Sequence, residues 1–304
     1  MTAAAEGPGS GRPVVGVVGL GIMGGAMARH LLAAGYEVVG HDVALATATA
    51  FTEAGGTSLA DAAAVAGASD VVILSLPSVA AFEAVVGGPG GLSSAPSPRA
   101  RAIADTSTMP LDLKLATHEQ LAGNGLEFLD CPISGTGAQM AVKDTVFYTS
   151  GDAAALSLAE PVLADCGKGV FNLGALGNGT RLKLVANHLV TIHNASAAEA
   201  ISLARHGGID PAVALEALVA GAGTSRMLEL RGQMMVDQVY EPATMKGEVF
   251  MKDVEIITGF ARKAGVPLPV FAAAAQLHLA AVSCGWGSAD TAAVHAVIER
   301  LSGA

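Results

Sequence analysis

The chain has 304 residues, 51% of them hydrophobic, so it can bury a sizeable core and is long enough for about two domains. Its formal net charge of −10 comes from 17 Lys and Arg against 27 Asp and Glu, which argues against nucleic acid and anionic membrane surfaces as partners. We expect no membrane span, because no apolar run looks long and uninterrupted enough. The composition indicates a globular protein that acts on small molecules or associates with other subunits.

The cysteine and histidine patterns point away from disulfides and metals. Three cysteines, Cys131, Cys166 and Cys284, are widely spaced, which fits neither a disulfide framework nor a zinc cluster. His188 and His193 are five residues apart and therefore do not share a helix face. We expect no metal cofactor and a cytoplasmic location.

In the first half of the chain, short β-branched runs alternate with Ala-rich stretches. Residues 1–12, rich in Gly, Ala and Pro, are expected to form a flexible leader before this pattern begins. Apolar runs bounded by Gly, Pro or polar residues predict strands at 14–18, 37–41, 70–74, 102–105, 126–131, 146–149 and 170–173. This alternation is typical of a mainly parallel sheet with helices between its strands.

The strand pattern stops after about residue 174. From residue 179 to about 205 the sequence predicts one long helix, and shorter helices follow to the end. We therefore predict an α/β fold in which a Rossmann-type doubly wound sheet occupies residues 13–174. An all-α domain for substrate binding and oligomerisation would occupy residues 175–304, with the long helix joining the two domains.

A Gly-rich turn follows the first predicted strand and opens a helix from about residue 22. It reads Gly19-Leu20-Gly21-Ile22-Met23-Gly24, the G-x-G-x-x-G pattern of a dinucleotide site. In this pattern Gly19 allows a tight turn, Gly21 lets a pyrophosphate approach the backbone, and Gly24 lets helix and strand pack closely. The alternative is a plain turn in a Gly-rich protein, but the flanking elements favour a cofactor site.

Asp42 ends the second predicted strand about 20 residues later, where a carboxylate can accept hydrogen bonds from both ribose hydroxyls of NAD. It would repel the 2′-phosphate of NADP, and the following Val43-Ala44-Leu45 supplies no Arg or Lys to neutralise that phosphate. We therefore predict NAD as the cofactor, with NADP disfavoured. The alternative role for Asp42 is the N-cap of the next helix.

Two more segments follow predicted strands, at the carboxyl ends where doubly wound sheets bind ligands. They are Leu76-Pro77-Ser78 and Thr106-Ser107-Thr108. Their hydroxyls and backbone groups are candidates to line the nicotinamide ribose. The alternative is that Ser and Thr after a strand cap the next helix.

Lys183 and Asn187 are the most informative pair of residues. They are i and i+4 on the long predicted helix, so both side chains lie on one face. Their neighbours are apolar, and burial there would lower the pKa of the Lys183 amine toward neutrality, which suits a group that takes and returns a proton. The alternative is a lysine that extends along the helix surface with its ammonium in water.

A loop after the strand at 126–131 offers a hydroxyl and successive backbone N–H groups. It reads Asp130-Cys131-Pro132-Ile133-Ser134-Gly135-Thr136-Gly137. Such an arrangement suits a carboxylate ligand, although a tight turn explains the same residues. Lys252-Asp253 falls on a later predicted helix, where adjacent opposite charges are by default a solvated ion pair.

Four of these segments, in this order, resemble signatures of the β-hydroxyacid dehydrogenase family, which includes 3-hydroxyisobutyrate dehydrogenase and tartronate semialdehyde reductase. They are residues 19–24, 130–135, 179–187 and 252–253, and residues 287–290 are similar too. The resemblance covers nearly the whole chain. It implies an enzyme that moves a hydride between NAD and the 3-hydroxyl carbon of a small 3-hydroxy acid, or that reduces the matching semialdehyde or keto acid.

The resemblance also implies roles for individual residues. Lys183 would be the general acid and base, and Asn187 would orient the substrate. Ser134 would take part in catalysis and, with Gly135, bind the substrate carboxylate. Lys252 would close over cofactor and substrate.

Thr108 falls on a family position that contacts the nicotinamide half of the cofactor. Thr136 is a departure, because the family usually has a second Gly after the Ser-Gly pair. Its Cβ and hydroxyl would alter the substrate-binding loop, which favours a polyhydroxy acid such as threonate; a β-hydroxy amino acid is another alternative. Imine reductases share the fold but usually replace the catalytic lysine, so Lys183 argues against that branch.

A non-catalytic dinucleotide-binding redox sensor is the competing hypothesis from another class. Such a sensor has no need for a Lys and an Asn one turn apart, so the sequence favours an enzyme. The second half of the chain also contains more apolar helix than a small domain can bury alone, and family members usually pair through it. We therefore expect a homodimer or a homotetramer.

Overall fold

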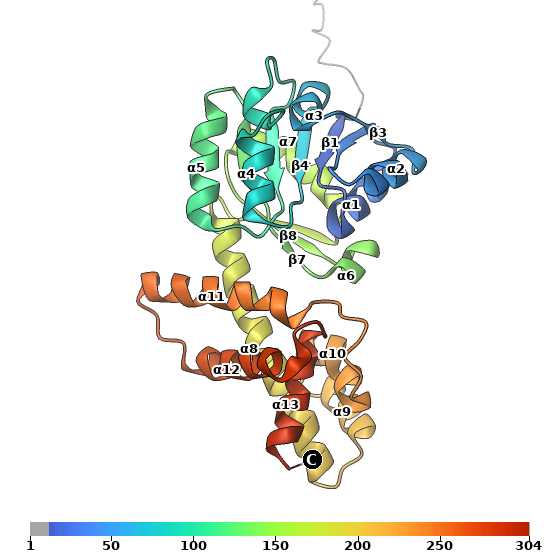
Figure 1. Ribbon diagram of the computed structural model, residues 1–304, viewed down its shortest axis with the longest axis vertical. Helices are drawn as coiled ribbons and strands as arrows, with labels where there is room; N and C mark the ends of the chain where they lie inside the picture. The colour runs from blue at the N-terminus through green and yellow to red at the C-terminus, as the bar shows by residue number, and fades with distance from the viewer. Residues whose placement is uncertain (1–11, 304) are drawn as a thin grey trace, which may run out of the picture. The chain divides into compact units, whose positions relative to one another are not determined.

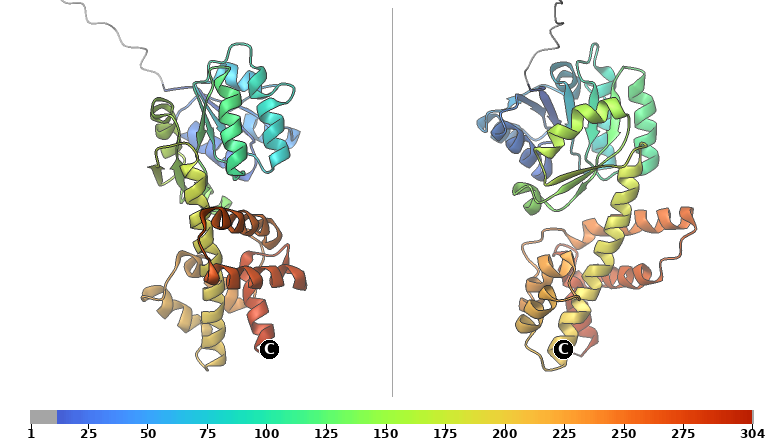
Figure 2. Two further views of the ribbon diagram at one scale, coloured as in Figure 1. Left: turned by 90° about the vertical axis from the view of Figure 1, so that its left-hand side faces the viewer. Right: turned by 180° about the vertical axis from the view of Figure 1, so that it is seen from behind.

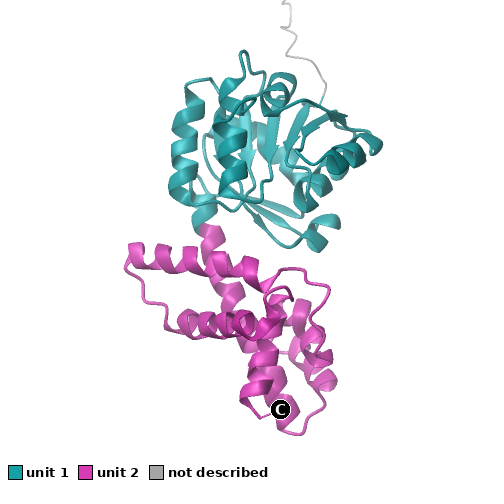
Figure 3. Cartoon of the chain, viewed as in Figure 1, with its two compact units in different colours: residues 1–181 teal, residues 182–304 magenta. Residues whose placement is uncertain are grey.

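The computed structural model describes residues 12–303, which form two compact units (Figures 1 and 3). Unit 1 comprises the described part of residues 1–181 and unit 2 that of residues 182–304. The predicted leader, residues 1–12, lies outside the described residues except for Arg12.

A six-stranded parallel sheet is the centre of unit 1, as the buried apolar runs predict. Its strands are β1 (Val15–Val18), β2 (Val38–His41), β3 (Thr57–Ser58), β4 (Val71–Leu74), β5 (Ala102–Asp105) and β6 (Glu127–Asp130). They are ordered β3-β2-β1-β4-β5-β6. The chain order therefore reverses between β1 and β4, and doubly wound sheets bind ligands at the carboxyl ends of the strands beside such a reversal.

Helices cover both faces of this sheet. They are α1 (Ile22–Ala33), α2 (Leu45–Glu53), α3 (Ala62–Ala68), α4 (Val79–Gly87), η1 (Leu92–Ser94), α5 (Leu111–Ala122) and α7 (Ala153–Ala164). Alternate residues of β4 face opposite sides: Val71 and Ile73 pack with α1 and α7, whereas Val72 and Leu74 pack with α3 and α4. Figure 2 shows α7 on the face opposite α4 and α5. Burial on both faces explains why these strands read as continuous apolar runs.

A small second sheet completes unit 1. It contains β7 (Ile133–Ser134), β8 (Val146–Thr149) and β9 (Gly169–Asn172), with the short helix α6 (Gly137–Ala141) between β7 and β8. The sequence predicts β8 and β9 but not β3 or β7. Each of those two strands has only two residues, too few for an alternating pattern to be visible.

The described part of unit 2 is entirely helical, as predicted. It begins within α8 (Asn178–His206) and continues with α9 (Pro211–Ala220), α10 (Arg226–Asp237), α11 (Gly247–Ala264), α12 (Pro269–Ala281), η2 (Val282–Trp286), η3 (Thr291–Ala293) and α13 (Val294–Leu301). The 29 residues of α8 form one continuous helix. Because unit 1 ends at residue 181, the first turn of α8 belongs to unit 1 and the rest to unit 2.

The stretch Pro269–Trp286 is long and apolar enough to cross a membrane by length and composition alone. The expectation that no run of the chain reaches this length is therefore wrong. Within the stretch, α12 buries Phe271 and His278 in unit 2, and Gly285 interrupts regular helix geometry with a φ of 96°. Only 22% of the stretch is buried, so much of its apolar surface remains exposed.

Candidate functional site

The Gly-rich turn between β1 and α1 has the geometry of a phosphate-binding turn. Gly19 has a φ of +87°, and a Cβ there would lie 2.3 Å from the carbonyl oxygen of Ser75. A Cβ on Gly24 would lie 1.9 Å from the carbonyl oxygen of Gly19, so only glycine allows this approach of helix to strand. A Cβ on Gly21 would meet nothing within 4 Å, which leaves open backbone at the start of α1. These residues fit a bound pyrophosphate.

Asp42 follows β2 and accepts two backbone hydrogen bonds. The N–H of Leu20 donates to its Oδ2 over 2.7 Å, and the N–H of Ala44 donates to its Oδ1 over 2.8 Å. The N-cap of α2 is Ala44, so Asp42 does not occupy the capping position that was its alternative role. The carboxylate is instead tied to the Gly-rich turn. Val43 and Leu45 beside it are 95% and 81% exposed, an apolar surface suited to an adenine ring.

Two side chains after β5 bond to the end of β4 and the loop that follows it. The N–H of Leu76 donates to Ser107 Oγ over 2.9 Å, and Thr106 Oγ1 donates to the carbonyl of Leu74 over 2.7 Å. Ser78 accepts from the N–H of Ala81 and caps α4, in agreement with the capping alternative for that residue. The remaining candidates of these loops, Pro77 and Thr108, are exposed and half-buried respectively.

Ser134 and Gly135 lie where β7 turns toward α6. Ser134 pairs with Val146 of β8 and is half-buried, and its hydroxyl has no hydrogen-bond partner among the described residues. Gly135 has a φ of +146°, and a Cβ there would lie 2.5 Å from Thr145 Cγ2. The glycine is therefore required by both its conformation and its packing.

Thr136 has a local structural role that the sequence analysis did not anticipate. It is the N-cap of α6, where its Oγ1 accepts from the N–H of Gln139 over 3.4 Å. In return, the N–H of Thr136 donates to Gln139 Oε1 over 3.0 Å, which completes a capping box. Its N–H and hydroxyl are thus engaged within α6, and its predicted contact with substrate stays a prediction.

Lys183 and Asn187 lie on α8, one turn apart, as predicted. Burial lowers the pKa of Lys183, and the Asp253 carboxylate opposes that effect. Asn187 is 6% exposed and donates from Nδ2 to Asp253 Oδ2 over 2.9 Å. The amine therefore lies in an environment that favours its neutral form, next to an amide held in one orientation.

Asp253 is a site residue that the sequence analysis did not single out. The adjacent pair Lys252-Asp253 suggested a solvated ion pair, and Lys252 is indeed exposed. Asp253, however, is 8% exposed and faces the core of unit 2. Burial raises its pKa, opposed by Lys183 and Lys252 and by the Asn187 hydrogen bond. Asp253 lies three residues after Phe250 and four before Ile257, on the apolar stripe of α11, and this spacing could have predicted its burial.

The described residues contain no group of three His, Cys, Asp or Glu side chains that could hold a metal ion. The candidate catalytic groups of unit 2 are the amine of Lys183 and the amide of Asn187. The candidate cofactor-binding groups of unit 1 are the open backbone at Gly21 and the carboxylate of Asp42.

Two family profiles together match nearly the whole chain. The profile for the NAD binding domain of 6-phosphogluconate dehydrogenase matches residues 14–175. The profile for the NAD-binding part of NADP-dependent 3-hydroxyisobutyrate dehydrogenase matches residues 177–298.

The chain is also similar along its length to characterised proteins. It is 36% identical to an L-threonate dehydrogenase of Cupriavidus necator over 92% of this chain and 94% of that protein. It is 30% identical to a 2-(hydroxymethyl)glutarate dehydrogenase of Eubacterium barkeri over 95% of this chain and 96% of that protein. A crystal structure of 3-hydroxyisobutyrate dehydrogenase from Salmonella typhimurium has a TM-score of 0.82 and 29% identity, and covers 93% of this chain and 99% of that chain.

Proposed function

The chain belongs to the β-hydroxyacid dehydrogenase family, and we propose that within it the protein is an NAD-dependent dehydrogenase of threonate or a similar polyhydroxy acid. Its activity is oxidoreduction of a small hydroxy acid with a nicotinamide cofactor. The observation that carries the chemistry is the Lys183–Asn187 pair on α8, with Asp253 bonded to the amide. The similarity to L-threonate dehydrogenase supports the substrate class.

The proposed mechanism assigns proton transfer to Lys183. NAD, which would be held by the Gly-rich turn and Asp42, would supply the acceptor for the hydride of the substrate carbon. During oxidation the neutral amine of Lys183 takes the proton of the substrate hydroxyl, and during reduction the ammonium returns it. Since burial lowers the pKa of this amine, more of it is neutral near physiological pH than for an ordinary lysine. Asn187, held by Asp253, supplies an amide of fixed orientation to the substrate oxygen.

The substrate carboxylate would bind at Ser134 and Gly135. Ser134 offers a hydroxyl without a partner among the described residues, and Gly135 has a φ of +146°, a conformation that favours glycine. Both features favour a carboxylate ligand at the end of β7.

The preference for NAD over NADP is proposed from Asp42. Its carboxylate is held beside the Gly-rich turn by the N–H groups of Leu20 and Ala44, at the end of β2. A 2′-phosphate near this carboxylate would meet like charge, and the next three residues carry no cation.

We also propose a homodimer or homotetramer, supported by an apolar groove in unit 2. The groove has a volume of about 400 Å³ and is lined by α11 and α12. Val266 and Leu279, which line it, are 53% and 44% exposed. A second copy of the chain would bury this surface. Analytical ultracentrifugation of the wild type against Leu279→Glu tests it: a monomeric wild type contradicts the proposal.

A cytoplasmic location is proposed from the cysteines. All three are free: Cys131 and Cys166 are buried and Cys284 is exposed. Free thiols persist in a reducing compartment. Fractionation of cells that express the full chain tests the location, and recovery outside the cytoplasm contradicts it.

The function is tested with a panel of hydroxy acids and NAD, monitored by the absorbance of NADH. We expect threonate to have a higher kcat/KM than serine, 3-hydroxyisobutyrate or glycerate. ¹³C NMR of the product then identifies the oxidised carbon, and oxidation at C3 is the outcome implied by the sequence resemblance. A clear preference for 3-hydroxyisobutyrate would contradict the proposed substrate, and no turnover of any acid would contradict the proposed function.

A further inference from the structure

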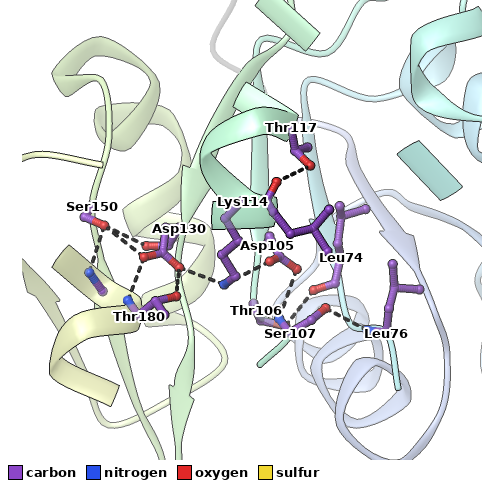
Figure 4. Close-up of polar contacts among 12 residues, drawn as sticks. Leu74, Leu76, Asp105, Thr106, Ser107, Lys114, Thr117, Asp130, Ser150 and Thr180 are labelled. Atoms are coloured by element: carbon purple, nitrogen blue, oxygen red, sulfur yellow. Dashed lines mark hydrogen bonds and ion pairs between the residues drawn. The ribbon is translucent and has the colours of Figure 1, made fainter. Parts of the chain in front are cut away.

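A buried lysine lies between two buried aspartates in unit 1 (Figure 4). Lys114 Nζ lies 2.7 Å from Asp130 Oδ1 and 2.9 Å from Asp105 Oδ2, and all three side chains are 0% exposed. Lys114 comes from α5, whereas the aspartates end the neighbouring strands β5 and β6. The proposed mechanism uses none of these three charged groups.

The two aspartates occupy paired positions of adjacent parallel strands. Two carboxylates on directly opposed positions repel each other, and burial strengthens that repulsion. Burial by itself would lower the pKa of Lys114, but the carboxylates of Asp105 and Asp130 outweigh it and raise the pKa above the ordinary value. Lys114 is therefore an ammonium ion that holds two strand ends together.

Such a buried charged cluster is a weak source of stability. Removal of three side chains from water costs about as much free energy as their mutual attraction returns, so apolar side chains of the same size often serve a core equally well. In some proteins a buried cluster of charges instead fixes the arrangement of the groups that it joins. Asp105 and Asp130 each bond to a further segment of unit 1.

Asp130 holds the first turn of α8. The N–H of Thr180 donates to its Oδ2 over 2.6 Å, and Thr180 Oγ1 donates to its Oδ1 over 2.7 Å. Ser150 Oγ donates to the backbone carbonyl of Asp130 over 3.2 Å and accepts from the N–H of Gly179 over 2.9 Å. Lys183 lies three residues beyond Thr180 in the same helix.

Asp105 holds the loops at the nicotinamide side of the predicted cofactor site. Its Oδ1 accepts from the N–H of Ser107 over 3.0 Å. Ser107 Oγ in turn accepts from the N–H of Leu76, so the loops after β4 and β5 are joined. Thr108, the candidate for contact with the nicotinamide half, is the next residue.

From this arrangement we infer that Lys114 is a positioning residue for hydride transfer. It couples the loops that follow β4 and β5 to the first turn of the helix that carries Lys183. The inference rests on the proposed function, because it assigns Lys114 an effect on the chemical step. Binding of the adenosine half of NAD, at Asp42, is independent of it.

The test compares Lys114→Met with Lys168→Met. Lys168 forms an exposed ion pair with Asp144 over 2.5 Å in the same unit, so its variant removes a Lys–Asp pair without touching the buried cluster. We expect Lys114→Met to lower kcat on the order of 10- to 100-fold, as for a small misplacement of reacting groups, with the Kd for NAD changed less than about threefold. The isotope effect on kcat, measured with deuterium in place of the transferred hydride, should rise, because slower hydride transfer limits the overall rate more strongly. Lys168→Met should match the wild type.

Hydrogen exchange measures positioning without any turnover. The peptides that cover residues 106–110 and 178–184 should exchange faster in Lys114→Met than in the wild type and in Lys168→Met. The exchange readout does not depend on turnover, so the two proposals can fail separately. If the wild type turns over no hydroxy acid, the proposed function fails. Unchanged exchange in both peptides overturns the role of Lys114 whatever the activity.

A second variant separates positioning from folding. Lys114→Met leaves two opposed carboxylates, which can destabilise unit 1, whereas the double variant Lys114→Met with Asp105→Asn removes the repulsion. We expect the double variant to recover the melting temperature but not kcat, because Asp105 and Asp130 remain unconnected. Recovery of kcat together with the melting temperature would show a purely structural role and overturn the inference.

Discussion

Asn187 donates its side-chain amide to the carboxylate of Asp253 over 2.9 Å, and both side chains are buried in unit 2. A carboxylate accepts hydrogen bonds but does not donate them when ionised, so this contact determines which end of the amide faces Asp253. Burial lowers the pKa of Lys183, and the same carboxylate opposes part of that lowering. One residue on α11 thus acts on both candidate catalytic groups of α8.

Substitution of Lys183 by Met should abolish most of the activity and leave the fold intact. General acid–base catalysis contributes on the order of 10² to 10⁴ in rate, so we expect kcat to fall by about that factor. Because folding lowers the pKa of Lys183, its ammonium is less favourable in the folded chain, and the variant should unfold at no lower temperature. Steady-state kinetics and calorimetry measure both quantities. Near wild-type turnover in this variant would remove Lys183 from the mechanism.

The pH dependence of oxidation should shift when Asp253 becomes Asn. Oxidation needs the neutral amine of Lys183, so kcat/KM rises with pH through the pKa of that amine and then levels off. Burial lowers this pKa and the Asp253 carboxylate opposes it, so loss of the carboxylate lowers the pKa further. The rising limb of the profile should therefore move to lower pH. Glu255→Gln on the exposed face of α11 is the control, and a shift to higher pH in Asp253→Asn would contradict this account of Lys183.

Cofactor preference should change with Asp42. Loss of two hydrogen bonds to ribose hydroxyls costs about 1–3 kcal/mol in total, which is roughly 5- to 150-fold in affinity. We expect Asp42→Ala to weaken NADH binding within that range and to leave NADPH binding equal or tighter, because the repulsion is removed. Titrations that follow NADH and NADPH fluorescence measure the two affinities, with Glu53→Ala on α2 as the control. Tighter binding of NADPH than NADH by the wild type would refute the assignment of Asp42.

His278 predicts an acid-sensitive step in the stability of unit 2. Burial lowers the pKa of His278 to about 4, although the Thr191 carbonyl opposes the shift. Because the pKa is lower in the folded than in the unfolded chain, the stability that depends on neutral His278 is present above about pH 6.5 and is lost as the pH falls toward 4. The pKa of His278 differs by about 2.5 between the unfolded and the folded chain, which corresponds to up to about 3 kcal/mol in the free energy of unfolding. Urea unfolding at a series of pH values should show a smaller loss for His278→Gln than for the wild type.

The regular parts of the fold are predictable because each has a strong local signal. Strands buried on both faces, such as β1 and β4, are continuous apolar runs, and the glycines at positions 19, 21 and 24 mark the turn beside them. Lys183 and Asn187 stand out because a helix places residues four apart on one face.

What sequence reasoning missed depends on side chains that meet only after folding. Lys114 is 16 residues from Asp130 in the chain, and its partner Asp105 lies on a different strand, so no local pattern joins the three. Its place on the buried stripe of α5, with Thr117 and Leu121, was the available signal. Thr136 is a different case, because its capping role has a local signal: Thr136 and Gln139 have the S/T-x-x-E/Q spacing of a capping box.

The burial of two of the three cysteines makes this protein convenient to label. Burial raises the pKa of Cys131 well above its usual value and that of Cys166 to about 12, so neither forms the reactive thiolate at neutral pH. Cys284, beyond the end of α12, is exposed. A maleimide dye added to the native wild-type chain should therefore attach at Cys284 alone. That gives a single-site fluorescent reporter in unit 2 without any engineered substitution.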